Sequence, residues 1–310
     1  FSPWDIPNLE NGPEGEYMTD RLAQEAVQFI DAQNETPFLL YLSFYSVHAP
    51  FDAPEERVER FAKKKEALGL TDDDRFATTT EGDKTFQYRK KQDHPTYAAM
   101  VESVDMAVGK VLDKLKSDNM EDNTVIIFFS DNGGLSTSEG IPTSNEPLRT
   151  GKGWLYEGGI REPAIVKWPG ESEAGMVTDA VMTSMDFYPT ILEMAGLPLR
   201  PDLHVDGKSL VPLMKNKADK LHEATYFHYP HISNQRGSPS SAIREGDYKL
   251  IVFFNDNKLE LYNIKDDIGE TQDLAVELPE KRDALYAKLQ QWWKDVDARF
   301  PEEYEGATSF

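Results

Sequence analysis

The sequence contains no cysteine among its 310 residues. Disulfide bonds, thiol nucleophiles and thiolate metal sites are therefore excluded within this chain. It also lacks any apolar run near the ~20 residues that a transmembrane helix needs, so no membrane span is expected. These absences do not fix the compartment. Because the chain begins with Phe1 rather than Met, we expect a longer precursor from which a signal peptide could have been removed.

Basic residues are scarce. The chain has 33 Lys and Arg against 55 Asp and Glu, which gives a formal net charge of −22. Nucleic-acid binding depends on clustered basic residues, and no such run is present, so a nucleic-acid partner is not expected. An acidic protein can still bind an anion where positive charge is local. The length allows one large domain and a smaller one, and the aromatic content argues against wholesale disorder.

The most informative stretch runs from Ser130 to Pro163. It follows TVIIFF (Thr124 to Phe129), which the composition predicts to be a buried parallel strand. Asp131 and Asn132 come at the carboxyl end of this strand, where open α/β sheets bind ligands. Their carboxylate and amide oxygens suit a hard cation such as Ca²⁺ or Mg²⁺. The alternative is that SDNGG forms only an Asx/Gly turn.

A second candidate is Lys152, which stands between Gly151 and Gly153 after nearly twenty polar loop residues. Long loops of this kind in compact domains are usually functional or disordered. The flanking glycines would let the backbone approach a ligand closely, and the ammonium group could bind an anion. The alternative is a solvated surface lysine.

A third candidate is His48, which follows FLLYLSF (Phe38 to Phe44), a second predicted buried strand. The helix predicted between the two strands favours a parallel pair, which would place His48 at the same sheet edge as Asp131. The Pro-bounded turn around His48 also allows a purely structural role.

The remaining pattern predicts helices and strands in alternation, followed by a change of composition. Helices are expected at about 19–33, 54–68, 94–119, 186–196 and 278–296. The helix at 94–119 should bury Met100, Met106 and a stripe of Val104, Val108, Val111, Leu112 and Leu115. Residues 71–93 should be irregular, and AIVKWPG and VTDAV should be short strands. From about residue 223, short strands joined by turns predict an antiparallel sheet with a closing helix. We therefore expect domains at 1–222 and 223–310.

Several segments together resemble the type I sulfatase family of the alkaline-phosphatase superfamily. These are PFLLYLSFYSVHAPF, SDNGG followed by GKGWLYEGGIREP, and DYKL with LYNIKDDIGETQDLA, where Asp267-Ile268-Gly269-Glu270 departs slightly from the family's pattern. The resemblance implies an α/β fold with an alkaline-phosphatase-like mixed sheet flanked by helices, plus a small C-terminal antiparallel subdomain. It also implies that Asp131 and Asn132 bind a divalent metal, usually Ca²⁺, that Lys152 contacts the sulfate, and that His48 contacts the ester or assists the leaving oxygen.

Two further histidines, His228 and His231, lie in YFHYPHISNQRGSPSSAIR. This segment is similar to one in a subset of bacterial sulfatases, where the C-terminal subdomain reaches over the active site. The resemblance therefore implies that His228 and His231 contact substrate. Both could instead be ordinary turn residues, since Pro230 lies between them at the end of a predicted strand.

The family's nucleophile is absent from this sequence. Type I sulfatases use a formylglycine made from Cys or Ser in C/S-x-P-x-R, and this chain has no cysteine and no serine in that pattern. The nearest segment, Ser238-Pro239-Ser240-Ser241, has the wrong spacing. By resemblance, the nucleophile and further metal ligands lie before Phe1. We therefore expect a C-terminal portion that is inactive alone, either a fragment or one piece of a nicked enzyme that pairs with its own N-terminal fragment.

The function implied is sulfuric ester hydrolysis, with a sulfated glycan or an aryl sulfate as substrate and a periplasmic or secreted location. One alternative is a phosphonate or phosphate monoester hydrolase of the same superfamily. Another is a non-catalytic, glycan-binding relative. The residues before Phe1 would distinguish these alternatives.

Overall fold

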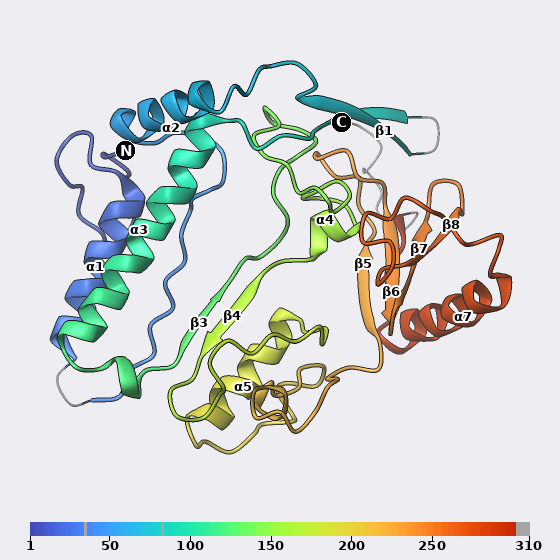
Figure 1. Cartoon of the computed structure of the whole chain (residues 1–310). Helices are drawn as coiled ribbons and strands as arrows, with labels where there is room; N and C mark the ends of the chain where they lie inside the picture. Colours follow the sequence, from blue (N-terminus) through green and yellow to red (C-terminus); the bar gives the residue numbers. More distant parts are fainter. Residues whose placement is uncertain (34–35, 82–83, 302–310) are drawn as a thin grey trace. The chain divides into compact units, whose positions relative to one another are not determined.

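The computed structural model describes residues 1–33, 36–81 and 84–301 (Figure 1). The chain divides into two compact units, which are described separately. The first comprises residues 1–76 and 91–125, and the second comprises 77–90 and 126–310. The domain boundary predicted at 222/223 falls inside the second unit, just before its four-stranded sheet, and it stays a prediction.

The first unit is built on three helices: α1 (Met18–Ala32), α2 (Glu55–Ala67) and α3 (Pro95–Ser117) (Figure 1). All three were predicted, and α3 contacts both of the others. The buried residues of α3 are Ala99, Met100, Ser103, Ala107 and Leu115. Met106 and Leu112 are each 41% exposed, so their predicted burial is wrong. Small residues occupy the contact instead, which lets neighbouring helices approach closely.

The predicted strand at Phe38–Phe44 does not form. This segment makes no β-ladder with any other described residue, and Leu39 and Tyr41 are 74% and 82% exposed. The prediction read an apolar run as a buried strand, but a strand also needs hydrogen-bonded neighbours.

A β-hairpin forms where the sequence predicted an irregular segment at 71–93. Its strands are β1 (Phe76–Glu81) and β2 (Lys84–Arg89). Both strands contain Thr and Phe, and β2 also contains Tyr, and these residues favour extended backbone. The Phe86 ring packs edge-on against Trp154, with 5.3 Å between the ring centroids. The hairpin therefore belongs to the second unit through its side chains as well as its backbone.

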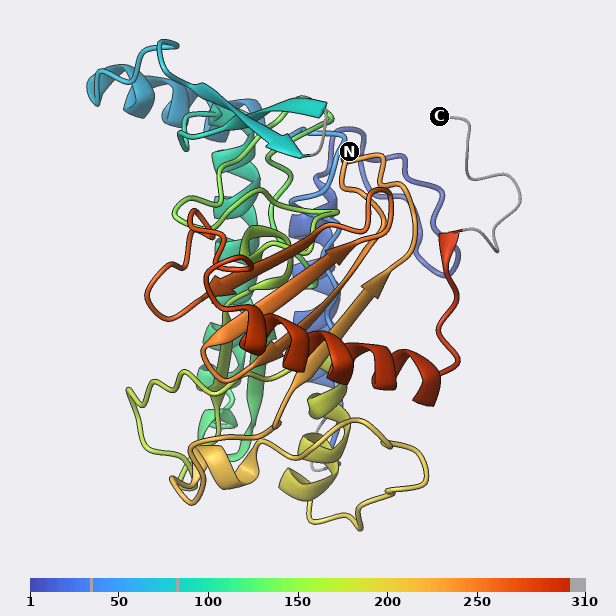
Figure 2. The ribbon, with the colours of Figure 1, turned by 90° about the vertical axis from the view of Figure 1, so that its right-hand side faces the viewer.

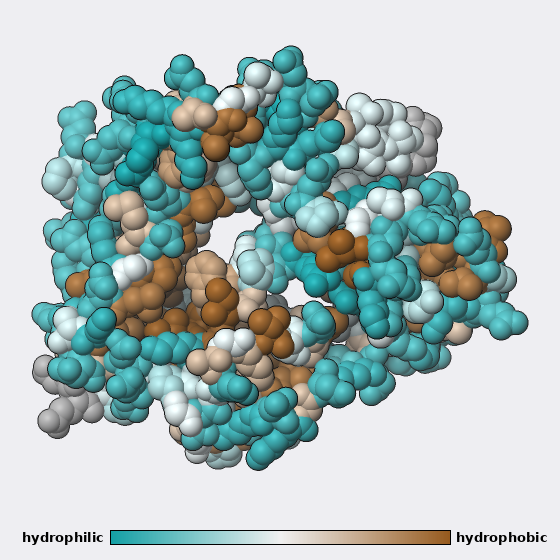
Figure 3. All heavy atoms as spheres, in the orientation of Figure 1, coloured by the Kyte–Doolittle hydropathy of each residue, from teal (hydrophilic) through white to brown (hydrophobic). Residues whose placement is uncertain are grey.

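The strand before Asp131 is β3 (Ile126–Phe129), and it pairs antiparallel with β4 (Ala164–Lys167). The predicted parallel, buried strand is thus wrong in both respects, although the strand itself and the AIVK strand are confirmed. Phe128 is 40% exposed and Ile165 is 63% exposed. Figure 3 shows hydrophobic atoms at the surface around this ladder.

The C-terminal part of the second unit is an antiparallel sheet in the order β5-β6-β7-β8. Its strands are β5 (Thr225–Tyr229), β6 (Ser240–Glu245), β7 (Tyr248–Phe253) and β8 (Leu259–Asn263). Helix α7 (Pro279–Asp295) lies across one face (Figure 2). The core between them contains Ile243, Leu250, Leu261, Leu285 and Leu289. The predicted sheet and closing helix are confirmed.

A short helix, α4 (Glu157–Ile160), lies between β3 and β4, and two more, α5 (Phe187–Met194) and α6 (Val211–Met214), lie between β4 and β5. The predicted helix near 186–196 is confirmed as α5, whereas the strand predicted at VTDAV is irregular. Asp186 is fully buried before α5, accepting hydrogen bonds from Lys208 N and pairing with His222 Nε2, both at 2.8 Å. These contacts hold the start of α5 against the segment around Lys208 and His222.

Candidate functional site

The Asp131–Asn132 pair lies directly after β3, where the chain leaves the ladder. Asp131 is exposed and Asn132 half-buried. The next residue, Gly133, donates its N–H to Gly159 O at 3.1 Å. A Cβ on Gly133 would lie 1.7 Å from Gly158 O, so no side chain fits at this position. The glycine therefore lets the end of β3 press directly against α4.

Residues 149–157, which we call the lysine loop, contact the segment that follows Asp131 and Asn132. Lys152 donates its backbone N–H to Gly134 O at 3.2 Å. The Asn145 side chain, which sequence reasoning missed, donates from Nδ2 to Gly134 O and to Thr150 O, both at 2.8 Å. The structure thus brings the segment of Asp131 and Asn132 and the segment of Lys152 together through main-chain hydrogen bonds, while the roles predicted for these three residues stay predictions.

Negative charge is concentrated at the end of β3. Burial, together with the nearby charge of Asp131, raises the pKa of Glu162 to about 7. Two carboxyl groups at this point, with the Asn132 amide oxygen, match the oxygen donors that Ca²⁺ and Mg²⁺ prefer. Across residues 1–33, 36–81 and 84–301, however, no group of three His, Asp or Glu side chains is arranged to hold a metal. The residues present therefore fit part of a cation site.

His48 belongs to the first unit. It is exposed, and its Nδ1 lies 2.8 Å from the carbonyl oxygen of Ala49. A carbonyl can only accept a hydrogen bond, so Nδ1 carries the proton in this contact, and Nε2 is the basic nitrogen of the neutral ring. The predicted proximity of His48 to Asp131, a residue of the second unit, stays a prediction.

His228 and His231 occupy different surroundings. His228 lies on β5, where Nδ1 bonds Ser241 Oγ, Nε2 bonds the carbonyl of Arg299 at 2.6 Å, and the ring packs against Trp292. His231 is exposed on the following loop, with its ring edge-on to Tyr229. The contacts of His228 are those of a packed structural residue, while His231 is accessible. The predicted substrate contacts of both residues stay predictions.

The loop that follows His231 packs against the lysine loop. The carbonyl of Gln235 accepts hydrogen bonds from Trp154 Nε1 at 3.0 Å and from Thr137 Oγ1 at 2.9 Å. A Cβ on Gly153 would lie 2.3 Å from Ser233 Oγ. The C-terminal part of the second unit thus packs against the residues next to Lys152.

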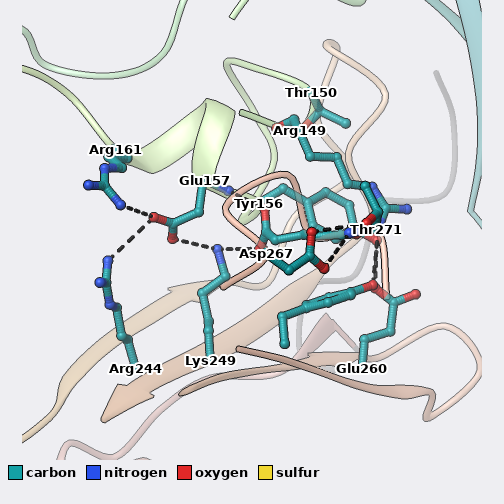
Figure 4. Close-up of polar contacts among 12 residues, drawn as sticks. Arg149, Thr150, Tyr156, Glu157, Arg161, Arg244, Lys249, Glu260, Asp267 and Thr271 are labelled. Atoms are coloured by element: carbon teal, nitrogen blue, oxygen red, sulfur yellow. Dashed lines mark hydrogen bonds and ion pairs between the residues drawn. The ribbon is translucent and has the colours of Figure 1, made fainter. Parts of the chain in front are cut away.

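Three buried charged residues were not identified as a group from the sequence. Lys249 Nζ lies 2.9 Å from Glu157 Oε1 (Figure 4). It also lies 2.6 Å from Glu270 Oε1. The backbone N–H of Glu157 donates to Glu270 Oε2 at 2.6 Å. None of the three is more than 1% exposed. We call Glu157, Lys249 and Glu270 the buried triad. Its members stand in the EGG, DYKL and DIGE segments, whose family resemblance was the available clue.

The two carboxyl groups of the triad differ in their electrostatics. Burial alone would raise the pKa of Glu157, but the charges of Lys249, Arg244 and Arg161 outweigh burial and lower it. Arg244 and Arg161 lie 3.3 and 3.4 Å from Glu157 Oε2. For Glu270, burial raises the pKa, and the charge of Lys249 offsets only part of that effect. Glu157 is therefore the firmly ionised partner.

A second network fixes the other end of the lysine loop. The Arg149 guanidinium stacks 3.9 Å from the Tyr156 ring centroid and donates to Tyr262 Oη at 3.0 Å and Glu270 O at 2.9 Å. Both tyrosine hydroxyls donate to Glu260 Oε2 at 2.7 Å. Burial raises the pKa of Tyr262, which keeps its hydroxyl protonated. Arg149 and Glu157 thus attach residues 149–157 to the C-terminal sheet (Figure 4).

Comparisons with known proteins agree with this architecture. The sequence profile described as Sulfatase matches residues 2–197, and the profile described as N-sulphoglucosamine sulphohydrolase, C-terminal, matches residues 150–298. A sulfatase of Formosa agariphila is 34% identical over 94% of this chain and 52% of its own length. Human steryl-sulfatase is 33% identical over 68% of this chain and 32% of its own length.

Solved structures show the same fold. The crystal structure of Ps i-CgsB in complex with k-i-k-neocarrahexaose superposes with a TM-score of 0.75 at 30% identity. The match covers 95% of this chain and 58% of that protein. The chain spans about half the length of the Formosa relative, and a similar share of i-CgsB.

Proposed function

Since this chain belongs to the sulfatase family, we propose that it supplies the cation-binding and sulfate-binding half of an enzyme that hydrolyses a sulfate monoester. The observation that carries this proposal is the pairing of two segments, in which Lys152 N and Gly133 N bond across to Gly134 O and Gly159 O. This pairing brings the backbone segments of Asp131, Asn132 and Lys152 into hydrogen-bonding contact.

In this proposal Asp131 and Asn132 hold one side of a divalent cation, with Ca²⁺ the expected ion. Such a cation, when bound, would neutralise negative charge on the sulfate oxygens. The Lys152 ammonium binds a sulfate oxygen and holds the ester in place. His48 contacts the leaving oxygen, where its ring can donate a proton. No residue of this sequence fits the family's formylglycine, so no step of the reaction is assigned to it here.

The oligosaccharide bound by i-CgsB supports a glycan as the alcohol part of the substrate. His231 stands on the loop that covers the lysine segment, so we assign it to contact the sugar. A periplasmic or secreted enzyme, suited to polymeric glycans, is part of the same proposal. Across the described chain, no helix has the length and apolar character needed to cross a bilayer.

The test uses the complete enzyme, meaning this chain together with the polypeptide that supplies the formylglycine. We expect hydrolysis of p-nitrophenyl sulfate and of a sulfated oligosaccharide, with inorganic sulfate as a competitive inhibitor. Lys152→Ala should lower kcat/KM by at least ~100-fold, because a preorganised charge at the reacting group is lost. Lys217→Ala, at an exposed lysine, is the matched control.

Two results would overturn the proposal. One is a Lys152→Ala enzyme with the activity of the wild type. The other is a preference for p-nitrophenyl phosphate or a phosphonate ester over the sulfate ester, which would favour the alternative hydrolase. The 310-residue chain assayed alone should show no turnover, since it provides no formylglycine.

A further inference from the structure

The lysine loop has a feature that its proposed role in binding does not explain. Lys152 lies near the middle of residues 149–157, and both ends of this segment are attached to the C-terminal sheet, in addition to the hydrogen bond from Lys152 N to Gly134 O. Arg149 bonds Tyr262 and the carbonyl of Glu270, and Glu157 pairs with Lys249 on β7. The position of Lys152 thus depends on the C-terminal sheet as well as on the segment after β3.

The same attachment reaches the cation-binding pair. The backbone of α4 continues from Glu157 into Gly158 and Gly159, which press against Gly133. The N–H of Glu157, the first residue of α4, donates to Glu270 Oε2. Because the loop of Lys152 is also attached to the sheet at Arg149, a shift of α4 on the sheet would change the separation between the segment of Asp131 and Lys152.

Stability alone does not account for three buried charges. The free-energy cost of removing charged groups from water is often larger than the gain from their mutual attraction. Neutral residues of similar size frequently give equal or greater stability. The triad is also fully enclosed, with exposures of 1%, 0% and 0% for Glu157, Lys249 and Glu270. What an ion triad provides over an apolar contact is a single geometry, because its attractions require short, directed distances.

We infer that the buried triad Glu157–Lys249–Glu270 is a positioning device of the active site, which sets Lys152 and the Asp131–Asn132 pair at their working separation. The three residues touch neither substrate nor cation. They act through α4 and the lysine loop. This inference rests on the proposed function.

The experiment compares two sets of substitutions in the complete enzyme. The neutral-triad variant carries Glu157→Gln, Lys249→Met and Glu270→Gln, which keep size and remove charge. The matched control carries Lys288→Met and Glu245→Gln, an ion pair at the surface of the same sheet. We expect the melting temperature of both variants to stay within a few degrees of the wild type.

The neutral-triad variant and the control variant should differ in activity. The neutral-triad variant should lose ~100-fold in kcat/KM, since small misplacements of binding groups cost that much, whereas the control should keep wild-type values. Its affinity for inorganic sulfate, measured as the sulfate-dependent rise in melting temperature, should fall in parallel.

A double-mutant comparison distinguishes positioning from a general loss of structure. If the triad acts through Lys152, the neutral-triad substitutions should lower kcat/KM by less than ~3-fold in a Lys152→Ala background. A full ~100-fold loss in that background would show that the triad acts independently of Lys152, and would overturn the inference.

The remaining outcomes are equally decisive. An active wild type with an equally active neutral-triad variant overturns this inference and leaves the proposed function standing. A wild type without sulfatase activity overturns the proposed function and this inference with it. Should the neutral-triad variant fail to fold, Glu157→Gln alone takes its place. If that variant also fails to fold, the triad is a folding requirement and the inference is wrong.

Discussion

The β3–β4 ladder and the four-stranded sheet β5–β8 are built from similar residues but differ in burial. The ladder reads IIFF and AIVK, and it leaves Phe128 and Ile165 exposed. The sheet strand β7 reads YKLIVF, and its Leu250 and Ile251 are fully buried. The difference lies in neighbours. β7 has a hydrogen-bonded strand on each side, and α7 covers one face of its sheet, whereas β3 has β4 as its single strand partner among the residues that the structure describes.

This contrast matters because the ladder carries the candidate site and the sheet stabilises it. Asp131 follows β3, yet the contacts that fix its surroundings come from α4 and, through the buried triad, from β7. The segment proposed to bind the cation is thus held by contacts from the C-terminal part of the second unit, which contains none of the proposed cation ligands.

The first prediction tests the contrast directly by removing one apolar side chain from each region. Leu250→Ala should lower the free energy of unfolding by about 3 kcal/mol, because it leaves a cavity in a closed core. Ile165→Ala, at a residue 63% exposed, should change it by less than about 0.5 kcal/mol. Urea unfolding of the 310-residue chain measures both values. Similar values for the two substitutions would contradict the contrast.

The second prediction breaks the link between the two regions. Gly133→Ala forces a Cβ against Gly158 O and should cost about 1–3 kcal/mol of stability. Gly109→Ala is the control, because Gly109 lies within helix α3 with open space around its Cα. It should gain about 0.5–1 kcal/mol through helix propensity. Thermal unfolding measures both, and an unchanged Gly133→Ala protein would show that the contact is not required.

The third prediction, with the smallest expected effect, concerns acid stability of the sheet. Burial alone would raise the pKa of Glu260, but hydrogen bonds from Lys258, Tyr156 and Tyr262 lower it below the usual 4.5. A lowered carboxyl pKa contributes stability that is present above the usual value and is lost as the pH falls through the folded-state value.

Glu260→Gln should therefore make the free energy of unfolding less dependent on pH between about pH 5 and about pH 3. The exposed Glu277→Gln serves as the control and should follow the wild type. Denaturant unfolding across this pH range measures the slopes. A steeper slope for Glu260→Gln than for the wild type would mean that Glu260 is not held ionised by its partners.

Sequence patterns predicted the parts of the fold that depend on local periodicity. The helices around Met100 and Leu285 and the four strands after residue 223 follow from 3.6-residue and two-residue repeats, together with turn residues. The strand at 38–44 and the parallel orientation of β3 were wrong, because pairing depends on distant neighbours that an apolar run does not specify.

The residues of the candidate site also differ in whether the sequence could identify them. Asp131, Asn132 and Lys152 stand beside glycines in recognisable motifs, and the structure places their segments in hydrogen-bonding contact. Asn145 and Lys249 have no such local signature. A lysine near the start of an apolar strand, as Lys249 is in β7, gives no indication of its partners when these are 92 and 21 residues away, at Glu157 and Glu270.

The two attachments of the lysine loop have a consequence for protein engineering. Exchanging C-terminal subdomains between related enzymes, to alter the glycan they accept, would cut between Glu157 and its partners on β7 and in the turn at Glu270. In a chimera joined there, the junction would run through the buried triad, so its charged residues would come from two different proteins. The transferable cassette is residues 149–159 together with 240–272, and crossover points outside both ranges should give the hybrids that retain turnover.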